Sequence, residues 1–301
     1  MCGAVGVDRV ETVVNGPAGF PKIIEYFRSH GVTRVGIEST GIYHREVTRA
    51  LRAAGFTVDV LQPKQVKAYA QFRLQRAKSD AIDAKLIARC TADLDRPCRV
   101  HDPRLEAFAE RLTMLDQLVE DVACLKTRRE SFRDPHVLDL LNGQIAALEK
   151  VIAAERKTLM EAVKKHADLK RRYALLESIR GIGDKTALML VIRMPELGDL
   201  TREEAASLLG VAPFVHQSGK YEGLRRTGGG RARARTALFA ATQAAIQWNP
   251  ALKALYGRLI ANGKAHAVAI IACVRKLIVY ANTVLARGTP WVQDAPLPTT
   301  R

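Results

Sequence analysis

Residues 32–61, VTRVGIESTGIYHREVTRALRAAGFTVDVL, carry the pattern that decides the fold of the first third of the chain. Residues 32–37 form a short apolar run typical of a strand, and residues 57–61 form a second one. Between them, apolar residues recur at helical spacing until Gly55, which predicts the end of a helix. This stretch therefore predicts a β-α-β unit.

The same alternation extends toward the N-terminus. Residues 5–8 and 10–14 have the composition of strands, and Asn15-Gly16-Pro17 is a turn signal. Residues 20–30 then carry apolar side chains at helical spacing. We therefore expect an α/β domain over residues 1–100, in which helices pack on a sheet.

The rest of the chain has the periodicity of helices. Between residues 104 and 166, apolar residues recur at steps of three and four and are interrupted at Asp134-Pro135, which predicts a helical hairpin or coiled coil. We expect this part to form a connector over residues 101–170, followed by a helical domain over residues 171–301. The predicted fold class is α/β plus α.

The composition points to a polyanionic partner. The 301 residues include 47 Lys and Arg against 31 Asp and Glu, a formal net charge of +16, which favours nucleic acid over a membrane surface. The most apolar segment, residues 265–286, is interrupted by Arg275-Lys276 and does not predict a membrane span. Five cysteines without C-x-x-C spacing suggest neither disulfides nor a zinc site, and no signal-peptide pattern opens the chain. We therefore expect a cytoplasmic protein.

Four acidic residues of the predicted α/β domain stand out by position. Asp8 and Glu38 each end a predicted strand, while Asp80 and Asp83 lie three residues apart on one face of a predicted helix start. Such a group of carboxylates suits one or two Mg²⁺ or Mn²⁺ ions, which favour oxygen ligands. The alternative is ordinary: Asp80 stabilises a helix N-terminus and Glu38 pairs with an arginine.

Residues 210–238, GVAPFVHQSGKYEGLRRTGGGRARARTAL, combine one serine, Ser218, with a dense basic segment. Glycines ahead of a predicted helix start allow close backbone approach to phosphate, and guanidinium groups match its oxygens. The predicted nucleic-acid contacts of this segment are Lys220, Arg225, Arg226, Arg231, Arg233 and Arg235. The alternative is a solvated basic loop.

Ser218 lacks the surroundings of a hydrolytic serine. It is not in a G-x-S-x-G elbow, and no His-Asp arrangement is evident, although His216 lies two residues away. Activation of this hydroxyl would have to come from a metal ion or from a carboxylate elsewhere.

A second glycine pattern, Gly181-Ile182-Gly183, lies between two helical stretches, as in helix-hairpin-helix modules. There a glycine turn and the following helix N-terminus present backbone N–H groups to a DNA phosphate. We predict nucleic-acid contact by Gly181, Gly183 and Lys185, with a plain interhelical turn as the alternative.

Several motifs in the same order resemble the IS110 (IS-one-ten) family of insertion-sequence transposases, which is related to the Piv-type DNA invertases. The N-terminal motifs are VGIESTGIY (35–43), AAGFTVDVLQPKQ (53–65) and RAKSDAIDAKLIAR (76–89). The C-terminal motifs are SIRGIG (178–183), LLGVAPFVHQSG (208–219), GGGRARARTAL (228–238) and CVRKL (273–277).

The resemblance implies a RuvC-like, ribonuclease-H-type DEDD domain, a coiled-coil connector and a helical transposase domain of a bacterial protein. It implies that Glu38, Asp80 and Asp83, with Asp8 as the first carboxylate, hold Mg²⁺. It also implies that Ser218 attacks DNA to form a phosphoserine intermediate. A structured guide RNA and a homo-oligomer, dimer or tetramer, that completes the active site are implied as well.

The chain departs from the family pattern at its N-terminus. Members usually carry G-[IV]-D-x-[SH]-K and then a second strand, whereas here Val5-Gly6-Val7-Asp8 runs directly into Arg9. The segment is shorter by about a hairpin and lacks the expected lysine. Two alternatives to a transposase therefore stay open: a metal-dependent nuclease in which water attacks, and an inactive DNA- or RNA-binding remnant.

Overall fold

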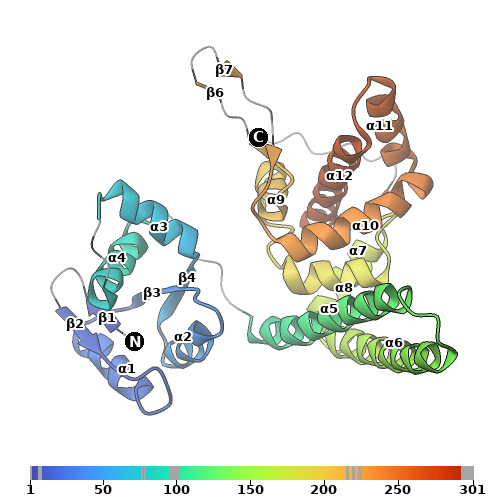
Figure 1. The fold of residues 1–301 in the computed structure, drawn as a ribbon. Helices are drawn as coiled ribbons and strands as arrows, with labels where there is room; N and C mark the ends of the chain where they lie inside the picture. The colour runs from blue at the N-terminus through green and yellow to red at the C-terminus, as the bar shows by residue number, and fades with distance from the viewer. Residues whose placement is uncertain are drawn as a thin grey trace. The chain divides into compact units, whose positions relative to one another are not determined.

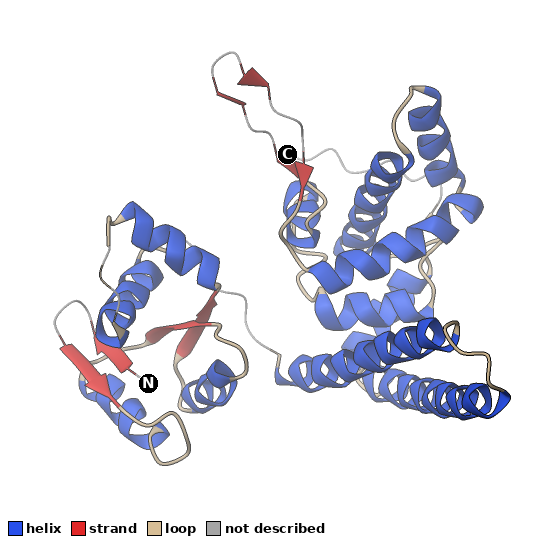
Figure 2. Ribbon diagram, viewed as in Figure 1, coloured by secondary structure: helices blue, strands red, loops and turns tan. Residues whose placement is uncertain are grey.

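The structure is a computed structural model that describes residues 2–5, 9–75, 77, 79–94, 102–214, 217–218, 221–222 and 226–292. The chain divides into two compact units, Met1–His101 and Asp102–Arg301 (Figure 1). The first is a mixed α/β unit and the second is largely helical (Figure 2). The predicted division into an α/β part followed by a helical part is thereby confirmed.

Among its described residues, the first unit contains short strands and four helices. In chain order they are β1 (Cys2–Val5), β2 (Arg9–Thr12), α1 (Phe20–Ser29), β3 (Arg34–Glu38), α2 (Tyr43–Ala53), β4 (Thr57–Leu61), α3 (Pro63–Phe72) and α4 (Asp80–Ala92). Strands β3 and β4 are parallel, with Glu38 opposite Leu61, and β1 and β2 form an antiparallel pair. Parallel strands require a crossover connection, which α2 supplies here. The predicted β-α-β unit is therefore present, whereas residues 6–8 of the first predicted strand lie outside the described residues.

Apolar residues at the predicted positions form the core of this unit. Ile23 and Phe27 of α1 pack with Val47 and Leu51 of α2 and with Val58 of β4. On the other side, α4 approaches β3 so closely that a Cβ on Gly36 would overlap the Thr91 hydroxyl. Glycine is therefore required on β3 where the helix crosses it.

The second unit begins with two long antiparallel helices, α5 (Pro103–Arg129) and α6 (Pro135–Lys164). Asp102 and Asp134 cap their N-termini by accepting backbone N–H bonds, and each is followed by the proline that suits the first helical position. Apolar side chains of both helices lie in one core cluster, and ion pairs such as Lys126–Glu149 at 2.7 Å join the helices outside it. The predicted two-segment helical hairpin is confirmed.

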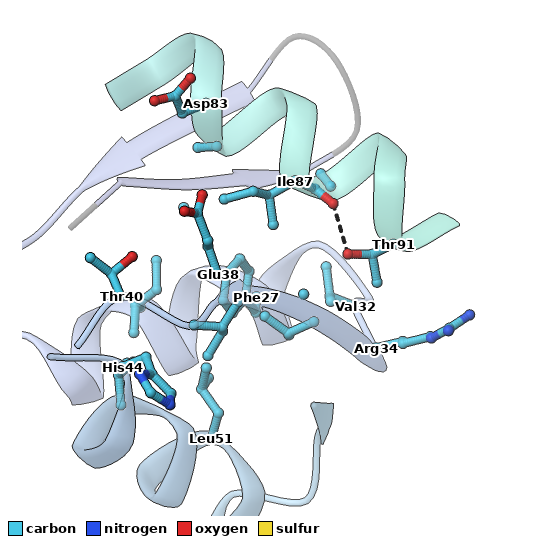
Figure 3. A pocket seen from close by; sticks show the side chains of 18 of the residues that line it. Phe27, Val32, Arg34, Glu38, Thr40, His44, Leu51, Asp83, Ile87 and Thr91 are labelled. Atoms are coloured by element: carbon cyan, nitrogen blue, oxygen red, sulfur yellow. Dashed lines mark hydrogen bonds between the residues drawn. The ribbon is translucent and has the colours of Figure 1, made fainter. Parts of the chain in front are cut away.

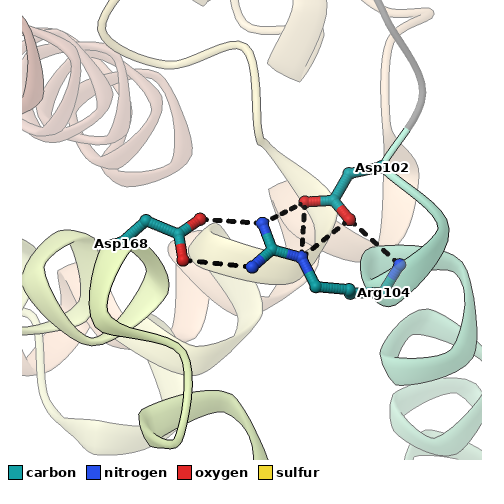
Figure 4. Close-up of polar contacts among 3 residues, drawn as sticks. All are labelled: Asp102, Arg104 and Asp168. Atoms are coloured by element: carbon teal, nitrogen blue, oxygen red, sulfur yellow. Dashed lines mark hydrogen bonds and ion pairs between the residues drawn. The ribbon is translucent and has the colours of Figure 1, made fainter.

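Arg104 joins the start of α5 to the start of α7 (Figure 4). Its guanidinium group lies 2.8 Å from a carboxylate oxygen of Asp102 and 2.8 Å from one of Asp168. Hydrogen bonding to Arg104 lowers the pKa of both aspartates, and the two carboxylates in turn raise the pKa of Arg104. The first turn of α5 is thus tied to the first turn of α7.

The remaining helices pack around a long apolar one. They are α7 (Ala167–Glu177), α8 (Asp184–Arg193), α9 (Arg202–Leu209), α10 (Ala232–Trp248), α11 (Pro250–Ala261) and α12 (His266–Arg287). By length and composition α12 is apolar enough to cross a membrane, but 56% of its most apolar window is buried against the other helices. Its apolar character is therefore explained by its place in the helical core.

Candidate functional site

Three of the four predicted metal-binding carboxylates line one cavity of the first unit. Glu38, Asp80 and Asp83 contribute to the wall of a cavity of about 670 Å³ between β3, α1, α2 and α4. Figure 3 shows Asp83, Ile87 and Thr91 along α4 and Glu38 on the facing side. Residues more than forty positions apart in the sequence are thus brought to one hollow.

Local structure places each of these carboxylates. Glu38 is the last residue of β3, and the next residue, Ser39, donates its backbone N–H to Leu61 of the neighbouring strand at 2.8 Å. Asp80 and Asp83 occupy the first turn of α4, whose N-terminus is capped by the Ser79 hydroxyl accepting from the N–H of Ile82. A strand end and a helix start, both hydrogen-bonded, therefore fix the backbone of the three residues.

Their oxygen atoms are suited to a hard divalent cation. Within the described part of the chain, no three carboxylate, imidazole or thiol groups lie close enough together to hold a metal ion. Asp8, the predicted first carboxylate, lies outside the described residues. The donor type and the shared cavity fit Mg²⁺ or Mn²⁺, and the assignment of these residues as ligands stays a prediction.

The cavity also contains polar groups that the sequence did not single out. His44, in the first turn of α2, lines the same wall as Thr40 (Figure 3), and its Nδ1 is buried without a hydrogen-bond partner among the described residues. Arg34 lines it too; its Nε binds Asp59 at 2.5 Å while its buried Nη2 has no partner in the described structure. In the sequence, His44 was marked by nothing more than its place six residues after Glu38.

Ser218 belongs to a small β structure of the second unit that the sequence did not predict. Strand β6 (Gln217–Ser218) pairs with β7 (Tyr221–Glu222), and β5 (Pro213–Phe214) pairs with β8 (Arg226–Thr227), both antiparallel. We call residues 211–229 the serine arm. The side chain of Ser218 and the residues His216, Lys220 and Arg225 lie outside the described part of the chain.

Three glycines close the base of the serine arm. Gly210 ends α9 at φ +83°, and Gly230 precedes α10 at φ +61°. A Cβ on Gly230 would overlap the backbone N of Gly210, and one on Gly210 would overlap the carbonyl of Gly229. Arg231 donates its backbone N–H to Leu208 at 2.9 Å across the same gap. We call Gly210, Gly229 and Gly230 the glycine clasp, because the arm leaves and re-enters the helical core there.

Three of the predicted phosphate-binding arginines have protein partners in this structure. Arg231 binds Glu196 through both guanidinium nitrogens, at 2.5 and 2.6 Å. Arg233 lies 3.2 Å from Asp116, and Arg235 donates to the carbonyls of Leu209 and Gly229. Arg226 is exposed on β8. These contacts anchor the start of α10 to its neighbours, and phosphate binding by these arginines stays a prediction.

The predicted glycine turn lies between α7 and α8, and its two glycines differ. Gly181 has φ +101° and packs so closely on α10 that a Cβ would overlap that of Ala245. Gly183 is the exposed N-cap residue of α8, with nothing within 4 Å of a Cβ built on it. Lys185 is exposed in the first turn of α8. Packing explains Gly181, while Gly183 and Lys185 are accessible to a ligand.

Comparison with known proteins gives matches to both parts of the chain. Residues 7–136 match a model of DEDD type described as "Transposase", and residues 173–257 match "Transposase IS116/IS110/IS902 family". Glu38, Asp80 and Asp83 fall in the first match and Ser218 in the second.

The matched relatives include two gene-inverting proteins and an insertion-element protein. The chain is 26% identical over 291 residues to the pilin gene-inverting proteins of Moraxella bovis and Moraxella lacunata, covering 93% of this chain and 89% of each of them. It is 26% identical over 161 residues to the insertion element IS110 uncharacterized 43.6 kDa protein of Streptomyces coelicolor, covering 53% of this chain and 40% of that protein.

Proposed function

Since the chain belongs to the IS110 family of DNA transposases and recombinases, we propose that it cuts and rejoins DNA with Ser218 as its nucleophile. In this proposal, Asp8, Glu38, Asp80 and Asp83 bind the divalent cation that transposases of this type generally use. The observation that carries the proposal is the common cavity of Glu38, Asp80 and Asp83.

The proposed reaction is a transesterification. A bond forms between Oγ of Ser218 and the scissile phosphorus as the bond from phosphorus to the leaving sugar oxygen breaks. The hydroxyl proton passes to a carboxylate, and the leaving oxygen takes up a proton. A bound Mg²⁺ or Mn²⁺ would neutralise charge on the phosphate and stabilise the leaving oxygen. Reversal of the step with a different strand's hydroxyl rejoins the DNA and releases the serine.

The family places DNA among the partners of this chain, and the finer architecture and further partners are part of the proposal. We propose a ribonuclease-H-type fold for residues 1–100, a connector over 101–170 and a transposase domain over 171–301. The parallel β3–β4 pair, with Glu38 at the end of β3, supports the ribonuclease-H-type fold. The glycine turn between α7 and α8, with Gly183 and Lys185 exposed, supports a helix-hairpin-helix-like element that contacts nucleic acid.

A homo-oligomer and a guide RNA complete the proposal. The carboxylates and Ser218 belong to different units, so the reaction requires that they meet at one phosphate. A second subunit can supply one half of the site. The net charge of +16 supports contact with more than one nucleic-acid strand, including a structured RNA.

A recombination assay with single variants tests the chemistry. We expect Ser218→Ala and Asp80→Ala to abolish strand exchange, while Ser131→Ala, in the turn between α5 and α6, and Asp139→Ala, exposed on α6, keep wild-type activity. Full activity of either active-site variant would refute the role assigned to that residue.

Trapping of denatured protein on labelled DNA separates the proposal from a metal-dependent nuclease. Only the serine route leaves a covalent adduct, which Ser218→Ala must lose. Cleavage without an adduct would favour attack by water. Calorimetric titration with Mn²⁺ that gives no heat beyond an Asp80→Ala control would favour a non-catalytic nucleic-acid-binding protein.

A further inference from the structure

Trp248 is an exposed aromatic side chain without an assigned role. It is the last residue of α10, and 74% of its surface is accessible. The chain's other tryptophan, Trp291, is half-buried and packs on Tyr280 with ring centroids 6.1 Å apart. An indole is large and mostly apolar, so a partner that covers its face gains both buried area and stacking energy.

The backbone around Trp248 is tied to the glycine turn between α7 and α8. Ala245, three residues earlier on α10, packs against Gly181. Asn249, the next residue, is fully buried and donates its side-chain N–H to the carbonyl of Arg180 at 2.9 Å, while its oxygen caps α11. Trp248 therefore stands beside this turn between two fixed contacts.

Three exposed cations lie on the elements that meet near this position. Arg180 lies in the turn, Lys185 is in the first turn of α8 and Lys253 is in the first turn of α11, and all three are exposed. Across the described residues none of them forms an ion pair. Their charge is suited to the phosphates of a strand that passes over the indole.

An acidic residue at the same helix end decides against a phosphate held directly by the α8 N-terminus. Asp184 is the first residue of α8, and its carboxylate interacts with Glu177 and Tyr173 of α7. A carboxylate there already uses the favourable end of the helix dipole and repels a phosphate. The turn therefore offers an aromatic face with cations around it rather than a bare backbone clamp.

We propose that Trp248 stacks on an unpaired base of a nucleic-acid strand whose phosphates are held by Arg180, Lys185 and Lys253. This inference rests on the proposed function, which supplies the nucleic acid. A flat ring offers its face to a base that is free to unstack, whereas paired bases in a duplex present only their edges. The partner is therefore single-stranded, either a DNA strand opened at the cut site or a loop of an RNA.

Intrinsic fluorescence measures this stacking directly. In the full chain with Trp291→Phe, Trp248 is the one remaining tryptophan. We expect its emission to be quenched by a short oligothymidylate or oligouridylate and not by a duplex of the same length. The stronger quencher of the two identifies DNA or RNA as the source of the base. Unchanged emission with both single strands would refute the inference.

Binding of the same oligonucleotides to Trp248→Ala provides a second test. Loss of one stacked base weakens single-strand binding about 5- to 150-fold. Trp248→Phe should recover part of this, and duplex affinity should change by less than about twofold in both variants, since duplex binding rests on phosphate contacts. Phe72→Ala, which removes an exposed aromatic of the first unit, serves as the control and should bind like the wild type. Equal losses for single strands and duplex would contradict stacking.

The two proposals fail in different ways. If Trp248→Ala binds single strands normally while Ser218→Ala still loses the covalent adduct, the stacking inference is wrong and the proposed chemistry stands. If Trp248 is quenched by single strands while no adduct forms in the wild type, stacking stands and the serine chemistry is wrong.

Discussion

The two glycines of the turn between α7 and α8 have different physical reasons to be glycine. Gly181 combines φ +101° with a close approach to Ala245, whereas Gly183 has extended backbone and open space around its Cα. We expect Gly181→Ala to lower the free energy of unfolding by more than about 2 kcal/mol, from left-handed strain and overlap together. Gly183→Ala should change it by less than about 1 kcal/mol.

Urea unfolding of both variants tests this difference. Because Gly183→Ala leaves the fold intact, its DNA affinity reports contact at the turn without interference from unfolding. Equal unfolding midpoints for the two variants would contradict the packing account of Gly181.

Asp59 is a buried carboxylate that pairs with Arg34 of the neighbouring strand. It is fully buried on β4, and its oxygen accepts from Nε of Arg34. We expect Asp59→Ala to destabilise the first unit by about 3 kcal/mol, since it leaves a largely buried guanidinium without its counter-charge. Glu149→Ala, which removes an exposed ion pair with Lys126, should cost less than about 1 kcal/mol. Thermal unfolding of the two variants measures both losses of stability. Similar losses would contradict the argument that a buried ion pair costs more to break than an exposed one.

At the scale of elements, Arg104 links the starts of α5 and α7 in a way that depends on pH. Hydrogen bonding to Arg104 lowers the pKa of Asp102 and of Asp168, so both carboxylates stabilise the fold above the unfolded pKa of about 4. That contribution is lost as pH falls through their lowered folded values. We therefore expect Arg104→Ala to be less stable than the wild type at neutral pH, with a difference that shrinks toward about pH 3.

Unfolding in urea at several pH values measures this difference. Arg129→Ala is the matched control, because Arg129 binds the uncharged side chain of Asn142 at 3.0 Å. Its destabilisation should not vary across the same acid range. If the destabilisation by Arg104→Ala did not change with pH, Arg104 would not be stabilising the ionised carboxylates of Asp102 and Asp168.

The glycine clasp makes a prediction about the element that carries Ser218. Gly210→Ala places a Cβ against the carbonyl of Gly229, so the base of the arm must open. We expect this variant to lose most strand exchange while its far-ultraviolet circular dichroism stays that of the wild type. Gly228→Ala, where nothing lies within 4 Å of a Cβ, should retain activity. Loss of activity in both variants, or in neither, would contradict the clasp.

Long elements were predictable from the sequence and short ones were not. The helical hairpin α5–α6 follows from apolar residues at steps of three and four around Asp134-Pro135, and β4 follows from its run of Val and Leu. The strands that carry Ser218 are two residues long, too short to show any alternation. The salt bridge of Arg231 to Glu196 joins residues 35 positions apart, so no local pattern could predict it. The basic composition of the segment predicted only that Arg231 binds phosphate.

The candidate site was predictable only within each motif. Spacing placed Asp80 and Asp83 on one helix turn, and the strand pattern placed Glu38 at a strand end, but their common cavity depends on how α4 packs across Gly36. His44 was missed because a histidine on a helix carries no pattern of its own. Which side chains share a cavity is decided by tertiary packing, which a local sequence pattern does not contain.

At the scale of the whole molecule, the carboxylates and the serine are carried by different compact units. We expect a mixture of Ser218→Ala and Asp80→Ala proteins to recombine DNA although each alone is inactive, because each supplies the half that the other lacks. Differently tagged proteins that co-purify verify that mixed oligomers form. Inactive mixed oligomers would show that both halves come from one subunit.

The glycine clasp has an evolutionary consequence. A segment whose two ends meet at one point can gain, lose or exchange residues without displacing α9 or α10, since the hydrogen bond from Arg231 to Leu208 closes the gap whatever the segment contains. Residues 211–229 of one relative should therefore be graftable into another with the helical scaffold unchanged. Residues of the arm other than Ser218 can then diversify while α9 and α10 keep their packing.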